Sequence, residues 1–511
     1  NIFIIFRNIS IKYNCLIGRW IKVEFIAHIR EHDYKIQTVE EHLREVKELT
    51  ELYGDKIGVK HLAGLAGMLH DLGKYTIEFK NYLLEAVNNP DSPPKRGSVD
   101  HSTAGGKLLY ELFHEGVNKT PIKGVLSEIV GNAIISHHAY LQDFLNPELE
   151  SIYLKRVRDK ELMNFEDTKR YFFEKVISKT DFIKYVNKAA VEVECYLNNV
   201  PPEQIEEQLM FLTKFIFSIL IDSDRTNTQL FEENKNIEQI KSHEQLFDLY
   251  YERLMEKINS FKKESVNNSI NRLRSEMSNQ CDEFAKKPSG IYTLSIPTGG
   301  GKTLASLRYA LKHAKIYKKK RIIYIVPYTT IIEQNAEEVR KILKDEFNVL
   351  EHHSNVIEDI DDNDENQDGI INMNQKLKLA KDNWDSPIIF TTMVQFLNVF
   401  YAKGSRNIRR LHNLSETVII FDEVQKVPIH CVSLFNKAVN FLKTRCQSSI
   451  VLCTATQPTL DFVEHKLEMN TDAEMINNIE NVIEAFTRVK IIDKASNESF
   501  NNKRLADFIL F

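Results

Sequence analysis

Apolar residues recur at helical spacing through the first half of the chain, from about residue 24 to residue 245. The segments 42–49, 65–69 and 211–220 show this spacing clearly. Residues three or four positions apart lie on one face of an α-helix, whereas the two-residue alternation of strands is rare here. The pattern predicts an all-α domain over 24–245, followed by a charged connecting helix or helix pair over 246–285.

The pattern changes after the turn residues 288–290. Short apolar, β-branched runs now alternate with helical patterns, and these runs are 291–296, 321–326, 387–392, 417–421 and 449–454. Apolar strands that alternate with helices are typical of a parallel sheet covered on both faces. We therefore predict a multidomain chain in which an α/β lobe over 286–511 follows the helical domain. The acidic run 358–368 is interpreted as a solvated loop.

Length and composition agree with an ordinary globular protein of two or three domains. The chain has 511 residues, of which 42% are hydrophobic and 27% are charged. Its net charge is −5, so any basic groove for nucleic acid must be local. Six cysteines without CxxC spacing argue against a zinc knuckle or a disulfide framework and favour a reducing, cytoplasmic location.

The first 23 residues are predicted to lie outside the fold. They begin with the apolar run Asn-Ile-Phe-Ile-Ile-Phe, which is too short for a signal sequence or a membrane span. We interpret them as an extension or a translation artefact, with Val23 as a misread start codon. No membrane association and no obligate homo-oligomer are expected.

The helical half carries histidines and aspartates in a pattern typical of metal ligands. An adjacent pair, His70-Asp71, lies within Gly-Met-Leu-His-Asp-Leu-Gly-Lys. The other predicted ligands are His42, His101, His137, His138, Asp222 and Asp224. An adjacent His-Asp can direct the imidazole to one cation while the carboxylate bridges two. We predict two divalent cations, and imidazole-rich ligation favours Mn, Fe, Co, Ni or Zn over Mg.

Such a pair of cations polarises a phosphodiester and activates water. Asp71 and Lys74 are therefore predicted catalytic residues, with Lys74 holding an oxygen or a carboxylate rather than acting as a base. A lone His-Asp pair is usually a surface or capping feature, and it is the number of histidines that favours a metal site. His28, His32, His61 and His114 are interpreted as core or surface residues, His28 being the one that can lie near the site.

A glycine-rich segment between a predicted strand and a predicted helix has the form of a phosphate-binding loop. It lacks the leading glycine of the strict GxxxxGK[ST] pattern but retains its end. The predicted nucleotide-binding residues are Thr298, Gly299, Gly300, Gly301, Lys302 and Thr303. Their amides would surround phosphates, Lys302 would meet the β- and γ-phosphates, and Thr303 would bind Mg²⁺.

An acidic pair, Asp422-Glu423, ends the predicted strand 417–421. In this position Asp422 suits a Mg²⁺ ligand and Glu423 a general base, so ATP with Mg²⁺ is the expected cofactor. Thr454 and Thr456, which follow the next strand, are interpreted as residues that couple the γ-phosphate to the strand.

The order of the metal residues resembles the HD phosphohydrolase superfamily, whose signature is H…HD…D. His42 matches the first histidine, His70-Asp71 the doublet, and Asp222 or Asp224 the last aspartate. Asp224 is preferred because the superfamily's final aspartate is often followed by a basic or aromatic residue, as Arg225 follows here.

The second half resembles superfamily 2 helicases. Residues 297–303, 422–425 and 454–456 match motifs I, II and III, and Val326-Pro327, Gln334 and Thr391-Thr392 resemble the motifs that contact the nucleic-acid backbone. The resemblance implies a RecA-like lobe. A second lobe with an arginine finger is not recognisable before Phe511, so we expect part of a longer protein, or a truncated product, that binds ATP weakly and does not translocate.

The two halves in this order resemble the CRISPR-associated nuclease–helicases of type I interference systems. That resemblance implies recruitment by an RNA-guided surveillance (Cascade-like) complex, 3′→5′ movement along DNA and cleavage of single-stranded DNA at the HD site. Two alternatives stay open. One is an HD nucleotidase or cyclic-nucleotide phosphodiesterase with a regulatory ATPase domain, and the other is a non-catalytic docking fragment.

Overall fold

The computed structural model describes nine segments of the chain. They are 25–30, 32–89, 92–95, 97–235, 244–264, 269–353, 383–454, 462–487 and 501–510, with the side chains of 244 and 262–264 not described. The predicted extension 1–23, the acidic run 358–368 and Thr456 lie outside the described residues.

The N-terminal half opens with a short hairpin and continues as helices. Strand β1 (Ile26–Ile29) pairs antiparallel with β2 (Ile36–Thr38). The helices are α2 (Val39–Gly54), α3 (Lys60–Leu69), α4 (Ile77–Asn88), α5 (Thr103–Leu109), α6 (Pro121–Ser136), α7 (Ile152–Leu154), α8 (Phe165–Lys175), α9 (Lys179–Leu197) and α10 (Ile205–Glu232). The helical prediction is confirmed, except that it missed the hairpin, whose strands are too short to show alternation.

Helix α2 begins where the sequence provides a complete capping box. The Thr38 side chain accepts from the Glu41 amide, and the Glu41 side chain accepts from the Thr38 amide. These two bonds satisfy amides that the first turn leaves free. Helix α3, rich in alanine and glycine, is almost wholly buried against α2. The short side chains allow the two helices to approach closely, which brings His42 of α2 beside His70 at the end of α3.

The C-terminal half contains a six-stranded parallel sheet with the order β3-β8-β7-β4-β6-β5. Its strands are β3 (Ile291–Ser295), β4 (Arg321–Val326), β5 (Val349–His352), β6 (Ile388–Thr392), β7 (Thr417–Asp422) and β8 (Ser449–Thr454). The predicted α/β lobe is confirmed, and five of these strands lie in the predicted runs. Edge strand β5 was not predicted. No helix among the described residues is long and apolar enough to cross a membrane.

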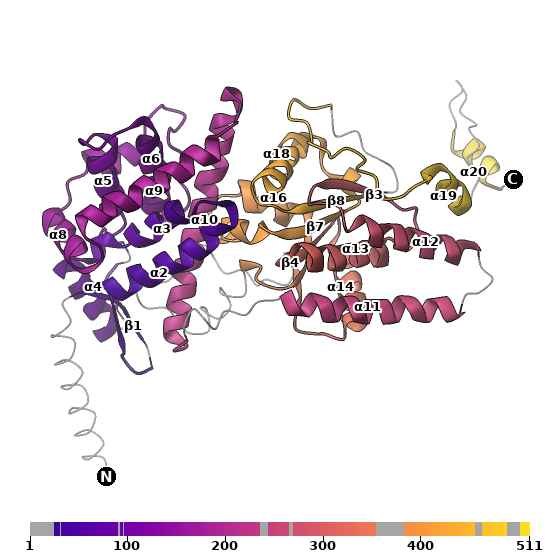
Figure 1. Ribbon diagram of the computed structural model, residues 1–511, viewed down its shortest axis with the longest axis horizontal. Coiled ribbons are helices and arrows are strands. Elements are labelled where there is room, and N and C mark those ends of the chain that lie inside the picture. The colour runs from indigo at the N-terminus through magenta and orange to yellow at the C-terminus, as the bar shows by residue number, and fades with distance from the viewer. Residues whose placement is uncertain are drawn as a thin grey trace, which may run out of the picture.

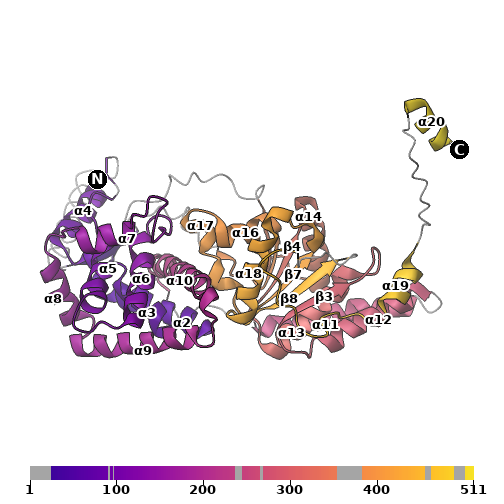
Figure 2. The ribbon, with the colours of Figure 1, turned by 90° about the horizontal axis from the view of Figure 1, so that it is seen from above.

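Helices cover both faces of this sheet. They are α11 (Glu244–Glu264), α12 (Ser269–Phe284), α13 (Lys302–Tyr317), α14 (Thr329–Leu343), α16 (Met393–Tyr401), α17 (Ser405–Ile408) and α18 (Val432–Thr444), with α19 (Ile479–Phe486) and α20 (Asn502–Leu510) toward the C-terminus. One face packs with α11–α14, as Figure 2 shows. The predicted helix pair at 246–285 is α11 and α12, packed on that face.

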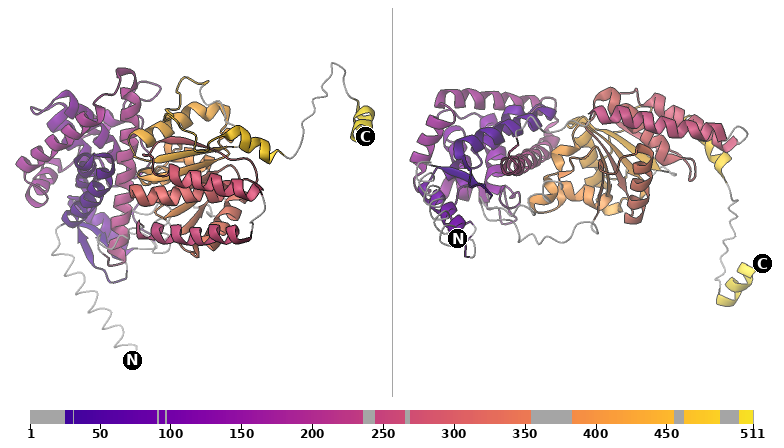
Figure 3. Two further views of the ribbon diagram at one scale, coloured as in Figure 1. Left: turned by 45° about the vertical axis from the view of Figure 1, so that its right-hand side comes forward. Right: turned by 90° about the horizontal axis from the view of Figure 1, so that it is seen from below.

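The other face of the sheet shares one apolar core with the helical half. Ile323 and Phe421 of the sheet belong to the same buried cluster as Leu43 and Leu65 of the helical half. Helix α10 stands between the two halves in Figures 1 and 3. Phe211 of α10 stacks on Phe441 of α18, with ring centroids 4.7 Å apart. Because apolar packing is continuous across this boundary, α10 is packed against both halves of the chain.

Candidate metal centre and nucleotide site

The structure brings seven of the eight predicted metal residues into two adjoining groups. The first group is His42, His70, Asp71 and Asp224, and the second is Asp71, His101, His137 and His138. Within each group the candidate ligand atoms all lie within 4.8 Å of one another. Asp71 belongs to both groups, which is the geometry of a bridging carboxylate. We call the two groups the metal centre.

Most of these side chains lie at or next to the end of a helix. His70 follows the last residue of α3, His137 follows the last residue of α6, and His101 lies just before α5. Gly73 lets the His101 segment approach, because its amide donates to the His101 carbonyl at 3.1 Å and a Cβ there would lie 2.5 Å from the His101 Cα. Glycine is therefore required at this position of the His-Asp-Leu-Gly-Lys motif, because a side chain would collide with the His101 segment.

Four histidines of the metal centre have the Nδ1 atom occupied by an oxygen acceptor. Nδ1 of His70 lies 2.9 Å from the Gly67 carbonyl, and Nδ1 of His42 lies 2.8 Å from Oδ1 of Asn227. Nδ1 of His137 and of His101 likewise faces the backbone carbonyls of Ile134 and Val99. A carbonyl can only accept, so each Nδ1 carries the hydrogen and each Nε2 turns a lone pair inward. This orientation is typical of metal-binding imidazoles.

Lone pairs face one another at the centre of the site. His42 Nε2 lies 3.1 Å from His70 Nε2 and 3.2 Å from Asp71 Oδ2. Asp71 Oδ1 and His137 Nε2 lie 3.4 Å apart, both buried and neither hydrogen-bonded among the described residues. Acceptors at these distances repel unless a proton or a metal cation lies between them. The donor set therefore fits the predicted divalent cations.

The charges of the site favour a cation. Burial alone would lower the pKa of His70, but the carboxylates of Asp71 and Asp224 outweigh it and raise that pKa to about 10. Burial opposes ionisation of Asp71, yet His70 and Lys74 hold its pKa well below the usual range. The carboxylates of the centre therefore stabilise positive charge. A proton supplies this charge in the metal-free protein, and a bound metal cation replaces the proton.

Lys74 and the two candidate aspartates occupy different places. Lys74 is buried with its Nζ 2.8 Å from Asp71 Oδ2, so it holds a carboxylate, as predicted. Asp224 Oδ1 lies 3.4 Å from His42 Nε2 and 3.6 Å from His70 Nε2. Asp222 is a correction: it belongs to neither group, because its side chain leaves the opposite face of α10 and pairs with Arg409.

Three further residues support the metal centre. His28 of β1 is buried with its ring centroid 4.7 Å from that of His42. Among the four histidines not predicted as ligands, it was the one expected to lie near the site. Burial and the charge on Lys74 lower its pKa well below the usual value. Asn227 orients His42, and Arg156 joins the segments that carry His101 and His137. Only the spacing of Asn227, one turn after Asp224, offered a signal in the sequence.

The glycine-rich loop lies between β3 and α13, as predicted. Gly301 caps α13 with φ 86° and Gly299 has φ 81°, a backbone conformation that glycine adopts without strain. The amide of Gly300 donates to the Pro297 carbonyl at 2.9 Å. The loop thus presents the N-terminus of α13, which attracts anions. Thr298 and Thr303 flank it.

The acidic pair reaches this loop from the end of β7. Lys302 Nζ lies 3.0 Å from Asp422 Oδ1 and 2.5 Å from Glu423 Oε1. Burial alone would lower the pKa of Lys302, but both carboxylates raise it. Gln425 accepts from the Thr454 hydroxyl at 2.9 Å, so β7 and β8 are linked beside the site. A bound triphosphate would compete with the carboxylates for the lysine.

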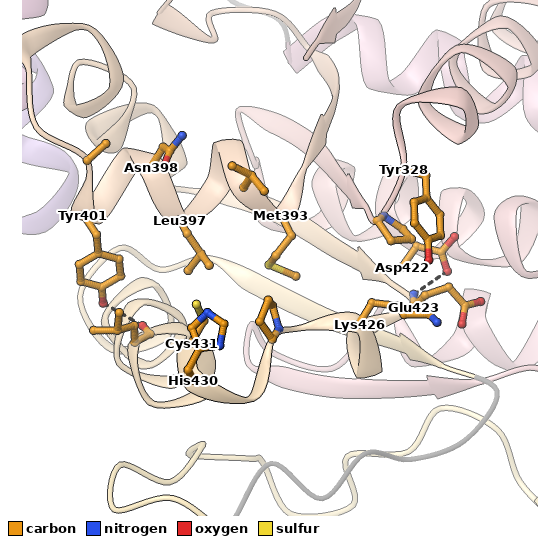
Figure 4. A pocket seen from close by; sticks show the side chains of 15 residues that line it. Tyr328, Met393, Leu397, Asn398, Tyr401, Asp422, Glu423, Lys426, His430 and Cys431 are labelled. Carbon is orange, nitrogen blue, oxygen red and sulfur yellow. Dashed lines mark hydrogen bonds between the residues drawn. The ribbon is translucent and has the colours of Figure 1, made fainter. Parts of the chain in front are cut away.

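A cavity of about 550 Å³ extends from the acidic pair along α16. Met393, Leu397 and Tyr401 line one wall from successive turns of that helix, and Lys426 and His430 line the opposite wall (Figure 4). Beyond Tyr401, the ammonium of Lys403 lies 4.4 Å from the ring centroid of Tyr140. Tyr140 follows His138 by two residues, so this contact joins the α/β lobe to the segment that carries His138.

Family models match both halves of the chain. The HD domain model matches residues 39–159, and the DEAD/DEAH box helicase model matches residues 279–463. A CRISPR-associated nuclease/helicase Cas3 of Haloferax volcanii is 26% identical over 182 residues, which cover 33% of this chain and 19% of the relative. A putative CRISPR-associated nuclease/helicase Cas3 of Methanocaldococcus jannaschii is 24% identical over 410 residues, covering 72% of this chain and 51% of the relative.

Solved structures align with most of this chain at low identity. The crystal structure of T. fusca Cas3 with AMPPNP aligns with a TM-score of 0.49 and 16% identity, covering 85% of this chain and 50% of that chain. A CRISPR RNA-guided surveillance complex before nicking aligns with a TM-score of 0.43 and 16% identity, covering 85% and 48%. The chain thus spans about half, or less, of the proteins that it matches.

Proposed function

We propose that this chain is part of a CRISPR-associated HD nuclease–helicase, that it cuts single-stranded DNA at the metal centre and that its α/β lobe binds ATP. The observation that carries the nuclease proposal is the inward orientation of four imidazoles around a shared carboxylate, Asp71. Such a centre suits hydrolysis of a phosphoester better than it suits a structural role, since structural sites are usually closed and tetrahedral.

The residues of the centre divide the work between ligands and support. His42, His70, Asp71 and Asp224 would hold one cation, and Asp71, His101, His137 and His138 the other. When bound, the two cations polarise the phosphodiester and lower the pKa of water. Lys74 neutralises Asp71 and fixes its orientation. Asn227 fixes the orientation of the His42 imidazole. Mn, Fe, Co or Ni suits this imidazole-rich set better than Mg.

In the α/β lobe, we propose that ATP binds at residues 298–303 with Mg²⁺ on Asp422 and Thr303. Glu423 lies beside the phosphate site and would orient or deprotonate the attacking water. Lys302 would exchange its carboxylate partners for phosphate oxygens. Unwinding in the 3′→5′ direction is proposed for the whole protein, of which this chain carries motifs I to III.

A long strand is the favoured substrate because an open cavity extends along α16 from the acidic pair. Its apolar and aromatic wall, with Met393, Leu397 and Tyr401, suits stacking with bases, which carries little sequence preference. Beyond the cavity, Lys403 contacts Tyr140, which lies two residues after His138. A mononucleotide would need no such cavity. We propose that a strand bound there is passed on to the metal centre without any sequence recognition.

Recruitment by an RNA-guided surveillance complex in the cytoplasm is proposed from the family alone. A nuclease without sequence preference requires that its substrate be presented only at the right place. We expect purified surveillance complex, bound to its DNA target, to retain this chain in a pull-down and to release it when the target is omitted. Equal retention with and without target would contradict recruitment.

Cleavage of circular single-stranded DNA tests the proposed function. We expect cutting with Mn²⁺ or Ni²⁺ and little with Mg²⁺, loss of cutting in Asp71→Asn, and retained ATP-independent cutting in Lys302→Ala. If Lys302→Ala alone abolished cutting, the two centres would not be independent. Cleavage of mononucleotides or cyclic nucleotides without cleavage of long strands would favour the nucleotidase. Behaviour that is unchanged by Asp71→Asn would favour the docking fragment.

A further inference from the structure

One helix carries a metal residue on one face and an anchor for the α/β lobe on the other. Asp222 and Asp224 of α10 are two positions apart, which turns their side chains about 200° away from each other. Asp224 faces His42 and His70, and Asn227, one turn later, holds His42 from the same face. Asp222 faces the α/β lobe.

Four residues of the α/β lobe and α10 form what we call the Asp222 clamp: Asp222, Asn383, Arg409 and His412. Arg409 Nε donates to Asp222 Oδ1 at 2.5 Å and His412 Nε2 to Oδ2 at 2.9 Å. Asn383 Nδ2 lies 3.2 and 3.3 Å from the two oxygens. Asp222 and His412 are completely buried, so this carboxylate is held from three directions.

Neighbouring turns of α10 extend the contact. Ser218, one turn before Asp222, donates to the Arg409 carbonyl at 3.1 Å and accepts from the His412 amide at 3.2 Å. Arg225, adjacent to Asp224, donates to the Ser405 hydroxyl at 3.1 Å. Positions 218, 222 and 225 form a stripe along one side of the helix. The segment 405–412 therefore fixes both the rotation and the height of α10 at the level of Asp224.

We propose that the α/β lobe positions Asp224 for metal binding through the Asp222 clamp, so that the metal affinity of the helical half depends on a contact made by the motor lobe. A buried ion pair constrains geometry strongly because breaking it leaves an uncompensated buried charge. Loss of the clamp would let α10 rotate, which displaces Asp224 from His42 and His70. Asp222, Arg409 and His412 are thus positioning residues. The inference rests on the proposed metal centre.

A second ion pair between α10 and the α/β lobe offers a matched control. Lys437 Nζ lies 2.8 Å from Glu207 Oε2, joining α18 to α10. Glu207 precedes Asp224 by 17 residues, or about 26 Å along the helix. Removing this pair disturbs the boundary between the halves without disturbing α10 near the metal centre.

The test is Mn²⁺ titration of the full 511-residue chain by calorimetry, with the paramagnetic spectrum of the bound ions as second readout. Asp222→Asn and Arg409→Gln are expected to raise the Kd for the ion of the ligand group that contains Asp224 about tenfold, comparable to losses at outer-shell partners of metal ligands. Arg409→Lys keeps the charge and should show a smaller rise, which keeps the test usable if Arg409→Gln does not fold. Glu207→Gln should leave both Kd values unchanged.

A purely structural role would lower the melting temperature of the clamp variants while leaving the Mn²⁺ affinities and the spectrum as in the wild-type protein, and that result would overturn the inference. An equal loss of affinity in Glu207→Gln would overturn it as well, since the effect would not be local to the clamp. If the wild-type chain binds Mn²⁺ but cuts no strand, the proposed nuclease function fails, while the clamp is still judged on the affinities.

Discussion

Asn227 and His42 are joined by a 2.8 Å hydrogen bond between the side-chain Oδ1 of the first and Nδ1 of the second. Asn227 comes from α10 and His42 from α2, so a residue outside the HD signature sets the tautomer of the first histidine within it. Gln37 also donates to Asn227 Oδ1 at 3.1 Å. The bond leaves His42 Nε2 free to face Asp71.

Replacing Asn227 with leucine should weaken metal binding. The substitution removes the acceptor for His42 Nδ1, so the imidazole can turn and present a hydrogen instead of a lone pair to the centre. We expect the Kd for Mn²⁺, measured by calorimetry, to rise about 10- to 100-fold. Asn227→Asp keeps an oxygen acceptor and should retain most of the affinity. Gln37→Ala, which leaves the His42 bond intact, is the second control, and similar losses in all three variants would contradict this role.

The two aspartates of the metal centre should differ in the number of ions that they control. Asp71 belongs to both ligand groups, whereas Asp224 belongs to one. We expect elemental analysis to find two ions per chain in the wild-type protein, one in Asp224→Asn and fewer than one in Asp71→Asn. Asp222→Asn would still bind two ions at saturating metal, with reduced affinity. Equal stoichiometry in the two metal-centre variants would argue against a bridging Asp71.

Arg156 should control the second ligand group. Its guanidinium donates to the Thr103 hydroxyl at 2.6 Å, to Ser102 Oγ at 2.9 Å and to the Ile135 carbonyl at 2.5 Å. It therefore ties the segment that carries His101 to the end of the helix that carries His137. A monodentate replacement cannot span both segments.

We expect Arg156→Gln to lose one of two ions in elemental analysis and to keep the group around Asp224. Arg158→Gln is the matched control, because Arg158 lies two residues away and half exposed, paired with Asp159 at 2.7 Å. If Arg156→Gln retained two ions while only its melting temperature fell, the residue would be structural. A loss of one ion in Arg158→Gln would show that the effect is not specific.

The sequence predicted the strands and the ligand histidines because each has a local signature. The runs at β4 and β7 have apolar centres, 322–326 and 418–421, as is typical of strands buried on both faces. Strand β5 escaped prediction because it is short, lies at the edge of the sheet and contains Glu351 and His352. The hairpin β1–β2 was not predicted either, because its strands are also short.

The parts of the site that the sequence did not predict depend on contacts between distant segments. Apart from Arg225, which follows Asp224, no local feature distinguishes Asp222 from Asp224, since both follow the same apolar stretch of α10. Their roles are decided by what packs on each face of the helix: His42 and His70 on one side, Arg409 on the other. Arg409 lies 187 residues beyond Asp222, so its pairing is invisible to local pattern analysis.

Protonation of His412 should lower stability as the pH falls. Burial is the largest cause that lowers its pKa to about 4, and the charges on Lys56 and Arg321 add to it, although Asp222 opposes them. The unfolded chain takes up a proton near pH 6.5, whereas the folded protein resists until about pH 4. The stabilisation is therefore full above pH 6.5 and is lost as the pH falls toward 4. Between pH 7 and pH 5 this loss is about 2 kcal/mol.

The variant His412→Gln isolates that contribution, because an amide can donate to Asp222 without titrating. In metal-free buffer, we expect the free energy of unfolding from urea titrations to fall less between pH 7 and pH 5 in this variant than in the wild-type protein, by about 2 kcal/mol. His313 is an internal reference, since burial also lowers its pKa to about 4 in a distant part of the α/β lobe. His313→Gln should reduce the pH dependence by a similar amount, and the double variant by the sum, because the two sites share no contact. Parallel pH profiles for His412→Gln and the wild-type protein would mean that His412 is already charged at neutral pH, held as an imidazolium by Asp222.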